Sequence, residues 1–125
     1  MKTSLVFTLP PSSLRIGLLE ARDVTIKPSS DSYRERVINE VRPFLSPDFM
    51  YPDHKQKGVR SLLKTFGFHP SGRSRPASEF LFKDLQNRGE FNFINNAVDI
   101  NNHISLLSHL PISVIDLDKS GYDLC

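Results

Sequence analysis

Residues 95–116, NNAVDINNHISLLSHLPISVID, constrain the fold of this chain more than any other stretch. Val98, Ile104 and Leu107 recur among polar residues at a spacing typical of a helix. Pro111 ends that helix, because proline lacks the amide hydrogen that a helix needs. The branched apolar residues that follow predict a strand. We therefore expect a helix over residues 96–109 and a strand over residues 112–117.

Three other segments carry helical patterns, over residues 33–45, 53–66 and 76–88. Gly67 and Gly89 follow the second and third segments, where a left-handed helix end favours glycine. The residues expected to face inward are Tyr33, Val37, Val41, Phe44 and Leu45 on the first helix, Val59, Leu62, Leu63 and Phe66 on the second, and Phe80, Leu81 and Leu85 on the third.

The N-terminal part of the chain predicts strands. Residues 5–9 form an apolar run that ends at two prolines, which suits an edge strand. Residues 14–26 predict a second strand with a bend or bulge around Arg22 and Asp23.

Composition describes an ordinary globular protein of one domain, with 125 residues of which 38% are hydrophobic and 24% charged. The net charge of +2 will not attract nucleic acid by itself. Cys125 is the single cysteine, so no internal disulfide can form.

No apolar run approaches the ~20 residues of a membrane span. The opening MKTSLVF imitates a signal peptide, but Thr8 and the prolines break its apolar run, so we expect a cytoplasmic protein with no membrane partner.

Positive charge gathers in residues 55–88, where eight Lys and Arg residues accompany two Asp and Glu residues. Some of these cations recur every three or four residues on one helical stripe, and others lie in a Gly/Ser loop whose amides also suit a phosphate. The functional interpretation is contact with an RNA backbone, and the alternative is a solvated helix face beside a flexible loop. The candidate RNA contacts are Arg60, Lys64, Arg73 and Arg75.

The polar residues near the fourth helix allow several kinds of site. Asp99 and His103 lie four residues apart, but no second histidine shares their face and no CxxC or HExxH pattern exists. We therefore expect no metal and no cofactor. A serine nucleophile in a GxSxG turn is also missing. Asn101 and Asn102 offer paired donors and acceptors for a carbonyl, a ribose hydroxyl or a water, or alternatively for buried backbone groups of the fold.

The segment NNAVDINNHISLLSHLPISVIDLD, residues 95–118, resembles part of the bacterial phenylalanyl-tRNA synthetase beta subunit that reads roughly N-N-V-V-D-[IV]-T-N-Y-V-M-L-E-x-G-Q-P-x-H-A-[FY]-D. That part belongs to the tRNA-editing module, the B-three/B-four domain. Residues 58–82 are more similar to the stand-alone members of the family. The resemblance spans about residues 14–118 and implies an α+β fold with a mixed sheet packed against about four helices.

The resemblance also implies which residues would form an editing pocket. The family's threonine-asparagine pair falls on Asn101 and Asn102, Asp99 keeps the family's aspartate, and the pocket histidine falls on Ser113. The glutamate with which the family recognises the tyrosine hydroxyl lies beyond the C-terminus of this chain. We therefore expect residues 1–125 to form a single editing-type domain that is incomplete at its C-terminal end.

Two hypotheses of function follow. In the first, the chain is a free-standing editing hydrolase that releases a wrong amino acid from aminoacyl-tRNA, with Asn101 and Asn102 orienting the ester and a water while Ser113 lines the pocket. In the second, the chain is a non-catalytic RNA- or aminoacyl-binding module. An acid or base that points into the pocket would distinguish the two. The nearby candidates for binding substrate are Glu79, Asp99 and His103.

Overall fold

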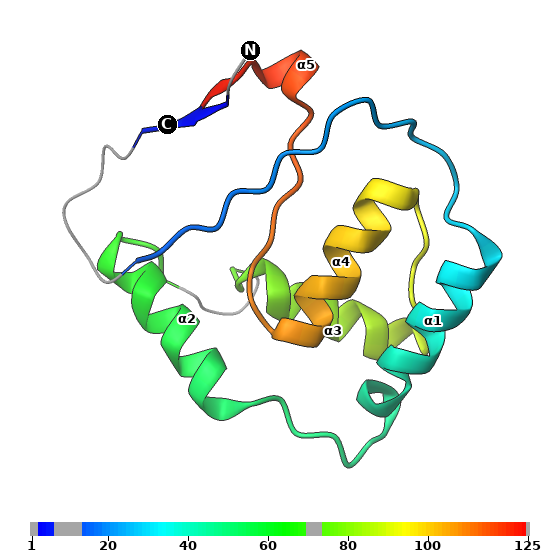
Figure 1. Cartoon of the computed structure of the whole chain (residues 1–125). Coiled ribbons are helices and arrows are strands. Elements are labelled where there is room, and N and C mark those ends of the chain that lie inside the picture. The colour runs from blue at the N-terminus through cyan, green and yellow to red at the C-terminus, as the bar shows by residue number, and fades with distance from the viewer. Residues whose placement is uncertain (1–2, 7–13, 70–73, 125) are drawn as a thin grey trace. The chain divides into compact units, whose positions relative to one another are not determined.

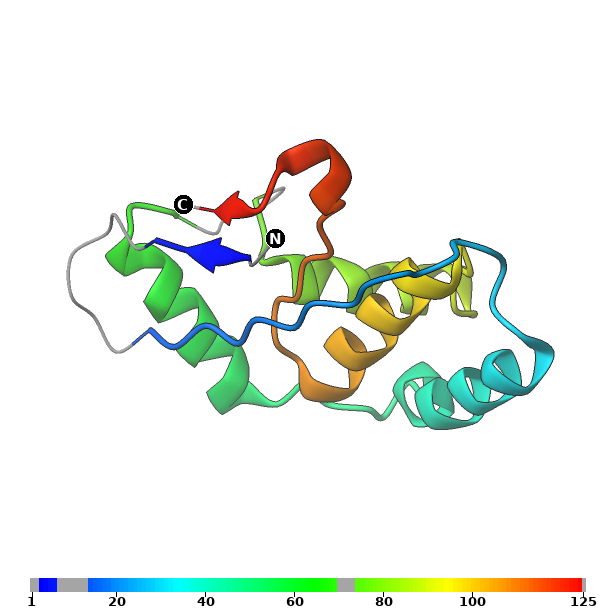
Figure 2. The ribbon, with the colours of Figure 1, turned by 45° about the horizontal axis from the view of Figure 1, so that its top comes forward.

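The computed structural model describes residues 3–6, 14–69 and 74–124 of the chain (Figures 1 and 2). Helix makes up 52% and strand 3% of the structure. The chain divides into two compact units. The first unit joins the residues up to Thr25 to those from Ile115 onward, and the second unit runs from Ile26 to Val114.

The second unit is built from helices. In chain order they are α1 (Asp31–Val41), the short 3-10 helix η1 (Arg42–Leu45), α2 (Asp53–Thr65), α3 (Ala77–Arg88) and α4 (Asn96–Ser108). α4 packs against both α1 and α3, as Figure 1 shows, and η1 packs against α3. The expected positions of the four main helices are therefore confirmed. The buried apolar core consists of Val37, Val41, Phe44, Phe82, Leu85, Phe91 and Leu106.

The inward face of α1 follows the expected spacing. Val37 and Val41 are buried four residues apart, and Phe44 continues that face in η1. α3 differs from the expectation, because Phe82 is buried whereas Phe80 is half exposed. Leu85 is buried and Leu81 packs against the core, as expected. Phe80 precedes Phe82 by two residues, which is about 200° around the helix, so Phe80 faces away from the core.

Local chemistry sets the ends of these helices. Ser30 and Asn95 begin α1 and α4, where each side chain accepts the backbone amide three residues further on. Gly67 and Gly89 follow α2 and α3 with φ angles of 84° and 73°, which confirms the expectation of left-handed helix ends. His109 ends α4 in the same backbone region, with φ 58°, although it is not a glycine.

α2 is attached to its unit differently from the other helices, because none of its residues is buried. Its Lys55 ammonium donates to the carbonyl of Ser108 at 2.8 Å. Its Arg60 guanidinium forms an ion pair with Glu79 of α3. Polar contacts thus join α2 to α3 and α4, while its apolar residues are only half buried. These residues are Val59, Leu62, Leu63 and Phe66.

The mixed sheet of the expected α+β fold is not present in the part of the chain that the structure describes. The strands of the described residues are β1 (Ser4–Leu5) and β2 (Asp123–Leu124), which pair in parallel within the first unit. The expected second strand, over residues 14–26, has no regular secondary structure, although the chain does bend at Asp23, with φ 55°. Apolar alternation favours an extended backbone, but a stable sheet also needs neighbouring strands to pair with.

The strand expected over residues 112–117 is also wrong. Residues 112–116 have no regular structure, and the next residue begins the short helix α5 (Leu117–Ser120). Asp116 caps α5, because its side chain accepts the amide of Asp118. Residues 7–9 of the first expected strand lie outside the described residues.

Gly58 lies inside α2, where an added methyl group would meet open space. Replacing it with alanine should stabilise α2 by about 0.5–1 kcal/mol, because glycine loses more backbone entropy in a helix than alanine does. Amide hydrogen exchange of α2 would measure this gain as slower opening. Gly67→Ala is the matched control and should destabilise the helix end, because φ is 84° there. Faster exchange in Gly58→Ala would contradict the account of α2.

Candidate functional site

α4 carries most of the residues expected in the editing pocket. Polar residues lie on its inward face, and isoleucines lie on its outward face. Asp99 and His103 are buried on the inward face, with 0% and 1% of their surfaces exposed. Ile100 and Ile104, one residue further along in each case, are about half exposed. A surface helix normally places its apolar residues inward. The polar residues on the inward face of α4 must therefore have partners within the protein, since burying them unpaired would cost free energy.

Asp99 joins three segments of the chain. Its Oδ2 accepts the Ser29 hydroxyl at 2.5 Å, and its Oδ1 accepts the backbone amide of Ile94 at 2.7 Å. Ser29 precedes α1, whereas Ile94 precedes α4. Hydrogen bonds to an ionised carboxylate are stronger than those between neutral groups. Both carboxylate oxygens are thus used to hold the segments that lead into α1 and α4.

His103 connects α4 to α1 through both ring nitrogens. Nδ1 lies 2.8 Å from the Tyr33 hydroxyl, and Nε2 lies 2.6 Å from Oε2 of Glu40, a close contact that lacks the alignment of a hydrogen bond. Arg36 donates to the other oxygen of Glu40 at 3.0 Å. The hydrogen bond from Arg36 is the main cause that lowers the pKa of Glu40, and burial raises the pKa of Tyr33. An imidazole with its proton on Nε2 can accept the tyrosine hydroxyl and face the carboxylate at once.

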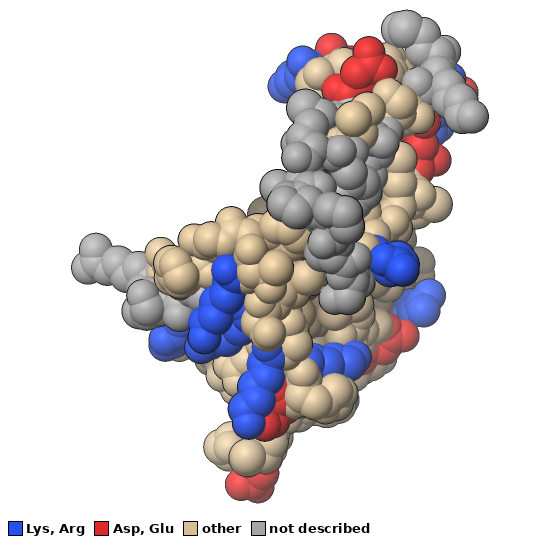
Figure 3. Space-filling view, turned by 90° about the vertical axis from the view of Figure 1, so that its left-hand side faces the viewer, with Lys and Arg blue, Asp and Glu red and all other residues tan. Residues whose placement is uncertain are grey.

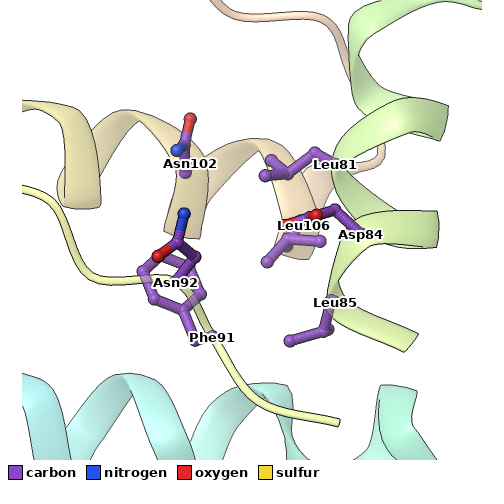
Figure 4. Close-up of a pocket in the computed structure, with 7 residues that line it drawn as sticks. All are labelled: Leu81, Asp84, Leu85, Phe91, Asn92, Asn102 and Leu106. Atoms are coloured by element: carbon purple, nitrogen blue, oxygen red, sulfur yellow. The ribbon is translucent and has the colours of Figure 1, made fainter. Parts of the chain in front are cut away.

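Asn101 and Asn102 lie next to each other, and Figure 4 shows Asn102 beside a small hollow between α3, α4 and residues 91–92. Asn101 Nδ2 donates to Oδ1 of Asn102 at 3.2 Å and to the carbonyl of Ile112 at 3.1 Å. The hollow measures about 40 Å³. That volume suits a water, whereas pockets for small molecules usually span ~300–1,000 Å³.

The carboxylate beside this hollow belongs to Asp84, a residue that the sequence did not mark as part of a site. Arg88, four residues later on α3, donates to both Asp84 oxygens at 2.9 Å. The only sequence signal for this role is the opposite charge at a spacing of four residues, which many surface helices share. Phe91, in the segment that leads into α4, also lines the hollow and belongs to the core.

Glu79 and Ser113, two residues expected near the asparagine pair, do not line the hollow. Ser113 is exposed. Glu79 has 7% of its surface exposed and binds Arg60 through two hydrogen bonds of 2.8 and 2.6 Å. The hydrogen bond from Arg60 is the main cause that lowers the pKa of Glu79. Arg60, which was expected to contact RNA, therefore binds Glu79, which was expected to contact the substrate.

The other Lys and Arg side chains of this region differ in their surroundings: some form ion pairs, and others are exposed to solvent. Lys57 lies 2.8 Å from Asp53 on the exposed side of α2, and Lys64 is exposed with no ion pair among the described residues. Arg75 is half buried, and Arg73 lies outside the described residues. Figure 3 views the molecule from the side on which α2 lies, and there the Lys and Arg side chains form separate groups, some beside carboxylates. Among the described residues, the cations in this view are thus separated by neutral and acidic side chains.

Comparison with protein families, with curated proteins and with solved structures finds no match to this chain. Over the described ranges, no group of three or more His, Cys, Asp or Glu side chains could hold a metal ion. None of the helices in those ranges has the length and apolar character to cross a membrane.

Replacing Asp99 with alanine should lower the free energy of unfolding by about 3 kcal/mol, because the Ser29 hydroxyl and the Ile94 amide would lose their acceptor. Urea unfolding followed by circular dichroism measures the change. Asp48→Ala, at an exposed aspartate, is the control and should change stability by less than about 0.5 kcal/mol. Equal effects of the two substitutions would show that Asp99 has no structural role.

The ion pair of Arg60 and Glu79 should appear as a coupling energy of about 1–3 kcal/mol in a double-mutant cycle of Arg60→Ala and Glu79→Ala. Because the pKa of Glu79 is lowered in the folded protein, this contribution is present above the unfolded value of 4.5 and is lost as pH falls through the folded value. Unfolding measured at about pH 7 and about pH 3 tests both points. Additive substitutions at neutral pH would be incompatible with the pair.

Proposed function

We propose that the chain is a non-catalytic RNA-binding module in which the exposed side of α2 contacts the phosphate backbone. The observation that carries the proposal is the exposure of Lys57 and Lys64 on α2, in the part of the chain with an excess of positive charge. Seven residues separate them, so they lie two turns apart on one side of the helix. Each phosphate that a lysine neutralises releases counterions and adds affinity that depends on salt.

The ion pairs on this side of α2 differ in how readily they yield to a phosphate. Lys57 and Asp53 are both largely exposed, and exposed pairs contribute little to stability, so Lys57 can exchange its carboxylate for a phosphate. Arg60 faces the buried carboxylate of Glu79, which would be left unpaired if Arg60 moved away. Arg60 therefore keeps its role in the fold, and Lys57 takes its place in the proposed RNA surface.

The small space beside the asparagine pair supports binding without turnover. An amino acid esterified to a terminal adenosine is as large as a drug molecule, for which pockets measure ~300–1,000 Å³, whereas the hollow beside Asn102 measures about 40 Å³. Asp99, His103 and Glu79 are each engaged by other protein groups. The editing hydrolase implied by the sequence resemblance remains a prediction, which the release of an amino acid from mischarged tRNA tests.

Binding of a tRNA transcript, measured by fluorescence anisotropy over a series of salt concentrations, tests the proposal. We expect affinity to fall as salt rises, and we expect Lys57→Gln with Lys64→Gln to lower the slope of log affinity against log salt by about one unit per lysine. Lys119→Gln removes one positive charge from an exposed position in the first unit and should leave the slope unchanged.

Two results would overturn this proposal. Binding that is absent, or whose slope is the same in the double variant and the wild type, would remove the role of α2. Release of tyrosine from a mischarged phenylalanine tRNA, faster than in buffer alone, would show that the chain is an enzyme and would restore the editing hypothesis.

A further inference from the structure

His109 lies in an aromatic cluster at the C-terminal end of α4. Its ring has 7% of its surface exposed. Ring centroids of four neighbours lie between 4.8 and 6.4 Å from the imidazole. These neighbours come from η1, from the connector before α2 and from α3, and they are Phe44, Phe49, Tyr51 and Phe82. The cluster therefore surrounds a titratable ring with apolar surface from several parts of the unit.

The surroundings of the His109 imidazole disfavour its charged form. Its Nδ1 is buried and has no hydrogen-bond partner among the described residues. Burial lowers the pKa of His109, and the positive charge of Lys55 lowers it further. The C-terminal end of a helix favours a nearby cation, which works in the opposite direction.

Lys55 and His109 meet at the same helix end. The Lys55 ammonium donates to the carbonyl of Ser108, the residue directly before His109, at 2.8 Å. The Tyr51 hydroxyl donates to the carbonyl of His109 at 3.4 Å. From α3, Glu79 acts on Tyr51 through its charge, but its carboxylate is bound by Arg60. No carboxylate among the described residues thus forms an ion pair with either Lys55 or His109.

We propose that His109 and Lys55 form a pH-sensitive latch that holds the N-terminal half of α2 against the end of α4. When the imidazole takes up a proton, two cations face each other at one helix end. Lys55 then leaves the Ser108 carbonyl for water, and the first turns of α2 separate from α4.

Two properties of α2 allow this movement. Val59 is the one apolar side chain in residues 53–60 and it is half buried, so separation of the first turns exposes little apolar surface. Its other anchor, between Arg60 and Glu79, persists in mild acid because the pKa of Glu79 lies below its usual value. The ion pair therefore acts as a pivot. The latch concerns the attachment of α2 and does not depend on whether α2 contacts RNA.

Hydrogen exchange of the full chain tests the latch. After correction for intrinsic exchange rates, opening of amides 57–60 should rise about tenfold between about pH 7.5 and about pH 5.5, while amides 103–106 of α4 should not respond. His109→Phe keeps an aromatic ring that cannot take up a proton, so the response should disappear. In Lys55→Gln, which lacks the facing charge, the same amides should open at one rate at both pH values.

A second measurement covers the case in which His109→Phe does not fold. In the wild type, the NMR signals of α2 should titrate with the midpoint of the His109 imidazole. His54 on α2 and His69 are exposed and serve as internal references. Signals that follow His54 or His69 instead, exchange in α2 that does not depend on pH, or an unchanged response in His109→Phe would each overturn the proposal.

Discussion

The carboxylate of Asp99 is the interaction on which the second unit depends. It is completely buried and binds one residue before α1 and another before α4, so one side chain sets how both helices begin. A buried carboxylate without partners would cost several kcal/mol, and two hydrogen bonds from the protein offset that cost. The backbone amide of Ile94 has no helical acceptor, so the same contact also satisfies a backbone group.

His103 extends this polar contact by one helical turn. It lies four residues after Asp99 on the same face of α4 and meets Tyr33 and Glu40 of α1. The two side chains make the interface of α1 and α4 specific, because a polar group without its partner would be costly there. Leu106 and the phenylalanines supply the apolar part of the core nearby. The outward side of α4 carries isoleucines instead, which is the reverse of an ordinary surface helix.

The sequence allowed the helices to be predicted because their signals are local. Periodic apolar residues, two glycines and a proline each act within a few positions. The strands expected over residues 14–26 and 112–117 were wrong because pairing depends on segments far apart in the sequence, which alternation within one segment does not reveal. The polar residues of α4 were marked as a site for a good reason, since Asp99 and His103 are chemically unusual on an inward face. Their partners, Ser29 and Tyr33, lie 70 residues away and carry no signal of the contact.

The central claim is that Asp99 and His103, on the inward face of α4, hold the second unit together through partners within the protein. Hydrogen exchange of the Ile94 amide tests this claim most directly, because Ile94 has an exposed side chain and lies outside any helix or strand. If Asp99 accepts this amide as described, its protection should match that of buried α4 amides. Exchange at the rate of an exposed loop would show that Asp99 does not hold the segment before α4, and it would contradict the account.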